Sequence, residues 1–219
     1  MHTLTKIINS ILKIIVNITL FLLDLIYKNG YRRFFVLETI ARIPYISYLS
    51  VLHLYQSIGR HPSYELMNMH FHQSVNEEYH LLIMEELGGN DLWINRFFAR
   101  SLGVFYFWTN CALYLFFPNS GYYLMEVVES HAADTYTSFL HDHETVLKQT
   151  NATKICHDYF FSTHTRMTSP PEKTESLNLY QVFESIRNDE VLHSKEMQNC
   201  STFTSLSSKN PGVELIKKP

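Results

Sequence analysis

The chain carries two short segments, EEYH at 77–80 and EVLH at 190–193, in which a glutamate precedes a histidine by three residues. Residues three apart lie on one face of an α-helix, so each segment aims a carboxylate and an imidazole at the same point. One such pair is common on helix surfaces. Two pairs in one chain are the pattern by which a four-helix bundle holds two metal ions, provided that two other helices each supply a further glutamate.

Two isolated glutamates meet that requirement. Glu38 lies in the apolar run FVLET at 35–39, and Glu129 lies in VVESHA at 127–132. The groups then follow the order Glu, E-x-x-H, Glu, E-x-x-H, with one group on each predicted helix. This order predicts an all-α fold, a ferritin-like di-iron four-helix bundle, whose metal ligands are Glu38, Glu77, His80, Glu129, Glu190 and His193.

The chemistry of this ligand set favours iron. Carboxylate oxygens are hard ligands that can bridge two ions, and four of them carry the charge that balances two divalent cations. Zinc is disfavoured because no cluster of cysteines and histidines with tetrahedral spacing occurs in the sequence. We therefore expect two iron ions as the cofactor.

Residues beside the predicted ligands have expected supporting roles. Asn76 and Asp189 each precede the glutamate of a pair, and they are candidates for hydrogen bonds that orient the histidines. Tyr136 follows Glu129 by seven residues, which is two turns along one helix face, so its phenol is the candidate catalytic group. On spacing alone, the alternatives are ordinary helix polar residues for the first two and plain core contact for the tyrosine.

Other titratable residues are expected to lie outside the site. Glu78, Glu85 and Glu86 are assigned to the solvated or structural side of their helix. Six histidines in polar or loop contexts are predicted to be solvated, namely His70, His72, His141, His143, His157 and His164.

Apolar periodicity and helix stop signals give the remaining organisation. Pro44 is expected to bend or open one helix, and Pro118 is expected to follow the end of another. The predicted helices cover 32–57, 63–87, 91–117, 122–148 and 175–200, with an irregular connection over 149–174.

The N-terminal stretch 7–27 is apolar enough to suggest a membrane span, but its polar residues form one narrow stripe. Lys13 and Asp24 inside hydrocarbon would each cost about 2.5–3.5 kcal/mol. A helix lying in the membrane interface avoids this cost, whereas a core helix of a soluble protein is the alternative. No small-residue cleavage site follows the stretch, so we do not expect a secretory signal. The expected divisions are a membrane-interface helix over 1–30, a di-iron bundle over 31–200 and a polar flexible tail over 201–219.

The overall composition limits the partners. The 219 residues have a formal net charge of −3, with 46% hydrophobic and 18% charged residues. No run of lysine or arginine occurs, so we expect no nucleic acid partner.

The segments that carry these groups resemble the plastid terminal oxidases, the plastoquinol branch of the alternative oxidase family. They are RFFVLETIARIPY at 33–45, NEEYHLLIMEELGGN at 76–90, VESHAADTY at 128–136 and IRNDEVLH at 186–193. The resemblance implies a non-haem di-iron enzyme that oxidises two quinols, plastoquinol or a related quinol, and reduces O₂ to two waters. It also implies attachment to one leaflet of a thylakoid or equivalent photosynthetic or respiratory membrane, and a homo-oligomer.

By position, the resemblance places the same six metal ligands and Tyr136 near the metals, and it places quinol-lining residues at Arg33, Leu37, Ala132 and Thr135. The connection over 148–177 is shorter than in that branch. Three other functions remain open from the residues alone: a membrane-bound di-iron hydroxylase of a quinone-like lipid, ferritin-like iron storage and a redox-inactive membrane protein.

Overall fold

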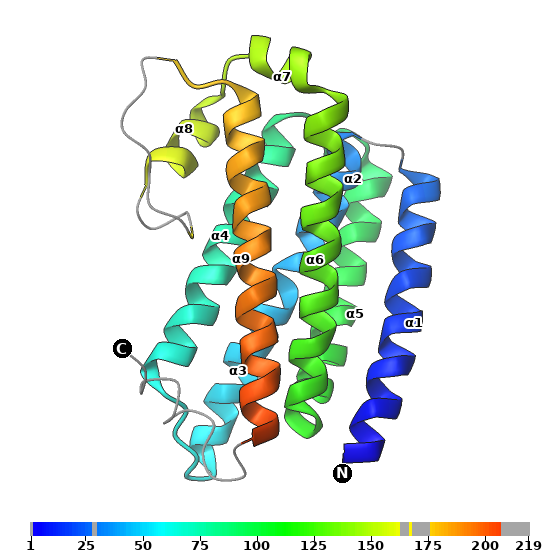
Figure 1. The fold of residues 1–219 in the computed structure, drawn as a ribbon, viewed down its shortest axis with the longest axis vertical. Coiled ribbons are helices and arrows are strands. Elements are labelled where there is room, and N and C mark those ends of the chain that lie inside the picture. The colour runs from blue at the N-terminus through cyan, green and yellow to red at the C-terminus, as the bar shows by residue number, and fades with distance from the viewer. Residues whose placement is uncertain (1, 28–29, 163–166, 168–175, 207–219) are drawn as a thin grey trace.

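The computed structural model describes residues 2–27, 30–162, 167 and 176–206, which form long helices and no β-strand, so the predicted all-α bundle is confirmed (Figure 1). The helices are α1 (His2–Ile26), α2 (Tyr31–Ala41), α3 (Ile43–Ser57), α4 (Tyr64–Glu86), α5 (Trp93–Phe116), α6 (Pro118–Asp142), α7 (Glu144–Gln149), α8 (Lys154–Phe161) and α9 (Leu179–Leu206).

Four helical rods surround the predicted metal ligands. They are α2 continued by α3, then α4, α6 and α9, and the most extensive contact between any two helices is that of α6 with α9. Figure 1 shows α6 and α9 side by side with α4 beyond them. Each rod supplies one group of the predicted set, as the sequence order requires.

The bend predicted at Pro44 separates α2 from α3. Arg42 between the two helices keeps right-handed helical angles, and Pro44 occupies the first turn of α3. Proline has no backbone N–H to donate, so the hydrogen-bond ladder is interrupted there while the direction of the rod is kept.

Several predicted helix boundaries are wrong. The helix before Pro118 ends at Phe116, as predicted, but α6 starts at Pro118 itself and not at 122, because proline is well tolerated in a first turn. The helix predicted to reach 148 ends at Asp142, and α7 follows as a separate short helix. The connection predicted to be irregular contains α8. The last helix continues to Leu206, past the predicted start of the tail at 201, and residues 207–219 lie outside the described residues.

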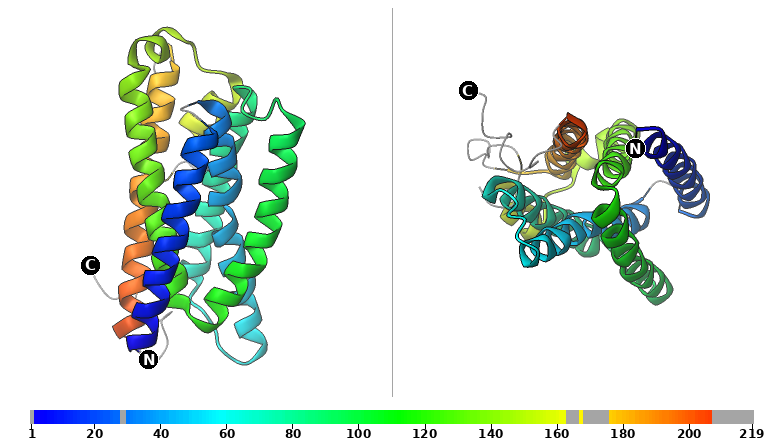
Figure 2. Two further views of the ribbon diagram at one scale, coloured as in Figure 1. Left: turned by 90° about the vertical axis from the view of Figure 1, so that its right-hand side faces the viewer. Right: turned by 90° about the horizontal axis from the view of Figure 1, so that it is seen from below.

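Two outer helices lie outside the four rods: α1 packs on α6, and α5 packs on the α2–α3 rod and on α6 (Figures 1 and 2). In α1, Leu20 and Leu23 are buried, whereas Ile11, Ile18 and Leu25 recur every seven residues on an exposed stripe. In α5, large exposed side chains include Trp93, Phe97, Val104, Phe105 and Trp108. The two helices therefore present apolar side chains outward from the bundle.

Among the described residues, two helical stretches are long and apolar enough to cross a membrane, Thr3–Ile26 and Tyr31–Ser57. The second is 67% buried inside the protein, as expected for a core rod, whereas the first is only 17% buried. Of these two stretches, the N-terminal helix is therefore the one that carries exposed apolar surface.

Candidate metal centre

Side chains from the four rods converge at the middle of the bundle. One group that could hold a metal ion consists of Glu38, Glu77, His80 and Glu190, and a second consists of Glu77, Glu129, Glu190 and His193. Within each group, one ligand atom from every residue lies within 4.8 Å of the others. The two groups share Glu77 and Glu190, so the geometry is that of two adjacent ion positions.

All six side chains are almost completely removed from solvent, with exposures of 0–1%. Burial, followed by the neighbouring carboxylates, holds the pKa of Glu129 well above its usual range; the pKa of Glu38 is also raised, chiefly by burial. For Glu77 burial acts upward, but contacts with His193 and His80 outweigh it and lower the pKa.

For the two histidines, burial and the neighbouring charges act on the pKa with signs opposite to those for Glu77. Burial acts to lower their pKa values, but surrounding carboxylates outweigh it, raising the pKa of His193 to about 10 and that of His80 well above its usual range. His193 Nδ1 lies 2.8 Å from Glu77 Oε1, and His80 Nδ1 lies 3.0 Å from Glu190 Oε1. The carboxylates that surround the two histidines therefore favour positive charge at this place in the bundle, which suits the binding of cations.

The hydrogen bonding of these residues tests whether the site suits a metal. In Glu77 and Glu190, both carboxylate oxygens are buried and make no hydrogen bond. The same is true of both ring nitrogens in His80 and in His193. Glu38 and Glu129 each have only Oε2 in that state. Buried polar atoms are rarely left without a partner, and a metal ion is one of the few explanations for such a cluster. Hard carboxylate and imidazole donors fit two iron ions.

Asn76 and Asp189 connect α4 to α9 beside this cluster. Asn76 Nδ2 donates to Asp189 Oδ2 at 2.9 Å, and Tyr159 Oη on α8 donates to the same oxygen at 2.6 Å. That oxygen also lies 3.7 Å from His80 Nε2. The structure therefore brings Asp189 close to a histidine of the cluster, and Asn76 reaches that histidine only through Asp189. It adds Tyr159, which the sequence did not single out because α8 was not predicted.

Two tyrosines contact the outer carboxylates. Tyr136 Oη donates a hydrogen bond to Glu38 Oε1, and Tyr45 Oη donates to Glu129 Oε1 at 2.6 Å. Tyr136 was predicted to lie near the metals, although its partner is the glutamate of the facing helix and not that of its own. Tyr45 was not considered, and the signal that could have found it is its position seven residues after Glu38.

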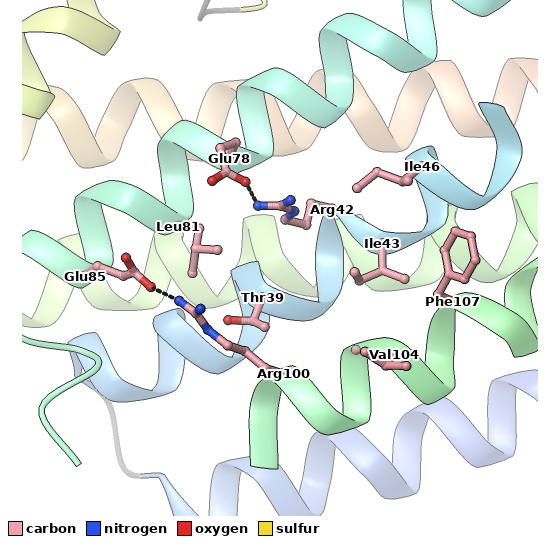
Figure 3. A pocket seen from close by; sticks show the side chains of 11 residues that line it. Thr39, Arg42, Ile43, Ile46, Glu78, Leu81, Glu85, Arg100, Val104 and Phe107 are labelled. Atoms are coloured by element: carbon pink, nitrogen blue, oxygen red, sulfur yellow. Dashed lines mark hydrogen bonds and ion pairs between the residues drawn. The ribbon is translucent and has the colours of Figure 1, made fainter. Parts of the chain in front are cut away.

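Of the three glutamates assigned to the solvated or structural side of α4, Glu86 is exposed and the other two form ion pairs away from the cluster. Glu78 pairs with Arg42, and Glu85 Oε1 lies 2.9 Å from Arg100 Nη2 (Figure 3). Both pairs line a surface pocket of about 510 Å³ between α4, α5 and the junction of α2 with α3. Neither glutamate belongs to the two groups that could hold an ion.

One histidine prediction is wrong. His70 is completely buried, because Gln73 on its own helix and Tyr122 on α6 supply partners for its two ring nitrogens, at 3.0 and 3.1 Å. His141 and His157 are exposed, as predicted, His72 and His143 are half-buried, and His164 lies outside the described residues.

The four residues predicted to line a quinol site lie on α2 and α6, and all are buried. Arg33 Nη2 donates to Thr135 Oγ1 at 3.1 Å and lies 2.6 Å from Asp24 Oδ1 on α1. The structure thus brings Arg33 and Thr135 together and ties them to the N-terminal helix. Leu37 and Ala132 are buried on the same two helices, each close in sequence to a cluster glutamate.

Comparison with known proteins supports the arrangement. A curated relative, "Ubiquinol oxidase 4, chloroplastic/chromoplastic" of Arabidopsis thaliana, is 42% identical over 202 residues. The alignment covers 88% of this chain but only 58% of the relative, so the chain spans less than two thirds of that protein's length. A sequence model described as "Alternative oxidase" matches residues 4–202. This chain, in which four helical rods bring four glutamates and two histidines together, therefore belongs to the alternative oxidase family.

Proposed function

We propose that the protein is a quinol:dioxygen oxidoreductase that couples the oxidation of two quinols to the reduction of one O₂ to two waters at a non-haem di-iron centre. The observation that carries the proposal is the buried cluster of four glutamates and two histidines with unpartnered ligand atoms. Membership of the alternative oxidase family and the likeness to a protein named a ubiquinol oxidase support it.

The pattern of free oxygens suggests how the chain would hold the ions. Glu77 and Glu190 belong to both groups and have both oxygens free, which suits carboxylates that bridge two ions. Glu38 and Glu129 each belong to one group and have one oxygen occupied by a tyrosine, which suits terminal ligands. His80 and His193 would complete one ion each. Two irons held there would supply the electron transfer that reduces O₂.

Tyr136 is placed to hold a proton beside this centre. Burial, followed by Glu38 and the other carboxylates, holds the pKa of its phenol well above the usual range. The phenol is therefore a donor at neutral pH, with its proton directed to Glu38 Oε1. We assign it the catalytic role of donating to the site during oxygen reduction. Asn76 and Asp189 orient His80.

The quinol would reach the site from the side of α1 and α5. A pocket of about 650 Å³ lies between the end of α1 and the start of α5, and its lining includes Leu25, Tyr31 and Arg32. None of the four predicted quinol residues lines this pocket, so the quinol would have to pass inward from it to Arg33, whose guanidinium would hold the quinone oxygens together with the Thr135 hydroxyl. Leu37 and Ala132 would contact the ring.

We propose that the protein is monotopic, with the exposed faces of α1 and α5 in one leaflet of a thylakoid or equivalent photosynthetic or respiratory membrane. Large apolar side chains exposed along both helices support the attachment. The relative's name places that protein in chloroplasts and chromoplasts. A homo-oligomer, a dimer or higher, remains a proposal that follows from the family.

Membrane attachment without a span predicts a specific protease result. Detergent should be needed to release the protein from vesicles, and protease added from one side should reach both the N-terminal and the C-terminal end. Epitope tags at the two ends and a blot after digestion measure this. Protection of one tag under conditions that remove the other would show that α1 crosses the bilayer.

Oxygen uptake by the iron-loaded protein with a plastoquinol or ubiquinol analogue tests the proposed activity. We expect quinone and water as products, whereas a hydroxylated lipid would identify the hydroxylase alternative. Iron taken up into a large soluble cage would identify storage.

Replacing Arg33 by alanine should raise the apparent KM for quinol by about tenfold or more, because a hydrogen bond to a charged group contributes roughly 1.5–3 kcal/mol. The iron content should stay at the wild-type level. Arg100→Ala is the matched control, since this arginine pairs with Glu85 outside the site. Wild-type quinol kinetics in Arg33→Ala would place the quinol site elsewhere.

A further inference from the structure

Glu38 and Glu129, the two glutamates that belong to only one ion group each, are both followed by a tyrosine at the same spacing. Their role as metal ligands does not explain this spacing. Glu38 is followed seven residues later by Tyr45, and Glu129 is followed seven residues later by Tyr136. Seven residues are two helical turns, so each tyrosine lies on the same side of its rod as the glutamate. Both tyrosines are completely buried.

The hydrogen bonds of these tyrosines are reciprocal. Tyr136 on the α6 rod donates to Glu38 of the α2–α3 rod, and Tyr45 on the α2–α3 rod donates to Glu129 of the α6 rod at 2.6 Å. In each glutamate, the tyrosine occupies Oε1 and leaves Oε2 buried without a hydrogen bond. Each of the two rods therefore supplies a tyrosine that holds one oxygen of the other rod's glutamate.

The surroundings of the two rings differ. Tyr136 stacks on Phe34 with a centroid distance of 4.2 Å, in an apolar setting. Tyr45 lies between two imidazoles, 5.6 Å from His193 and 6.1 Å from His70. His70 is itself held by hydrogen bonds to Gln73 and Tyr122, so the Tyr45 ring is confined by groups that are already fixed.

We propose that Tyr45 is a positioning residue of the metal centre: its hydroxyl fixes Glu129 so that only Oε2 is presented to the ion held with His193. A free carboxylate can rotate and bind an ion through one or both oxygens, and a donor on Oε1 selects the one-oxygen mode. Tyr45 would thus fix the carboxylate of Glu129 in the way that Tyr136 fixes the carboxylate of Glu38. The inference rests on the proposed di-iron centre.

Cobalt(II) titration of the metal-free full chain in detergent tests this without turnover. Cobalt(II) accepts the same oxygen and nitrogen donors, and its visible absorption reports the ligand arrangement of each ion. The wild type should bind two ions per chain. Tyr45→Phe should bind one of them about 10–100-fold more weakly, the usual effect of losing a hydrogen bond to a metal ligand, with a changed spectrum for that ion.

Tyr48→Phe is the matched control. Tyr48 is equally buried, lies one turn further along α3, and donates to the Gly121 carbonyl at 2.8 Å. Both substitutions remove one buried hydroxyl, so both should lower the unfolding temperature similarly, and only Tyr45→Phe should change cobalt binding. Incorporation of 3-fluorotyrosine at position 45 keeps the donor and should restore the wild-type spectrum.

Two results would overturn the inference while leaving the metal centre intact: wild-type affinity and spectrum in Tyr45→Phe, or an equal loss in Tyr48→Phe. A wild-type chain that binds no cobalt(II) would instead reject the proposed centre, and the inference with it. If the Tyr45→Phe chain does not fold, the protein with 3-fluorotyrosine at position 45 provides the test. A cobalt spectrum unlike that of the wild type would then contradict the inference.

Discussion

Glu77→Ala should lose iron and oxygen uptake together, with turnover falling to below about one thousandth of the wild-type value. Glu77 belongs to both groups that could hold an ion, and both its oxygens lack a hydrogen-bond partner. Its removal therefore takes one ligand from each ion and leaves His193 without its nearest carboxylate. Iron content by metal analysis and oxygen consumption with a quinol analogue measure the two effects.

Glu78→Ala is the control one position further along the same helix. Glu78 points about 100° away from Glu77 and pairs with Arg42 at the surface pocket (Figure 3). It should keep its iron and most of its activity. Two irons and full turnover in Glu77→Ala would reject the assignment of the centre.

Tyr136→Phe should lose oxygen reduction while retaining the fold and, with iron in excess, both ions. The substitution removes the proton held beside Glu38 but keeps the ring that stacks on Phe34. Loss of a positioned proton donor typically lowers a rate by about 10²–10⁴-fold. The kcat for oxygen uptake should fall by that order, with the apparent KM for quinol little changed.

The Tyr48→Phe variant serves again as the comparison, since the hydroxyl of Tyr48 donates to the backbone carbonyl of Gly121 and not to a glutamate of the cluster. A Tyr136→Phe enzyme with wild-type kcat would reduce the role of Tyr136 to that of holding Glu38.

The helix pattern and the cluster could be predicted from the sequence because both depend on short spacings. E-x-x-H fixes two side chains on one helix face whatever the rest of the chain does. An isolated glutamate in an apolar helical run faces the bundle core, where its carboxylate needs a polar partner or a metal ion. Glu38, Glu77, Glu129 and Glu190 accordingly lie on four different rods, and their side chains meet in one cluster.

What the sequence did not show depends on partners far along the chain. His70 looked like a solvated residue because Tyr122, which completes its hydrogen bonding, lies 52 residues away. The short helices α7 and α8 contain too few turns to display a periodic pattern. Tyr45 has the same spacing from Glu38 as Tyr136 has from Glu129, but it lies directly after Pro44, where the helix was expected to bend or open and the seven-residue spacing to be interrupted.

The ion pair between Asp24 and Arg33 joins the outermost helix directly to the proposed quinol site. The helix that would rest in lipid is thus also a wall of the route by which substrate arrives. Such an enzyme works in two dimensions: its rate follows the mole fraction of quinol in the bilayer, not the amount per volume of suspension. Extra lipid without quinol would slow it by surface dilution, whereas diluting the vesicles in buffer would leave each enzyme's turnover unchanged.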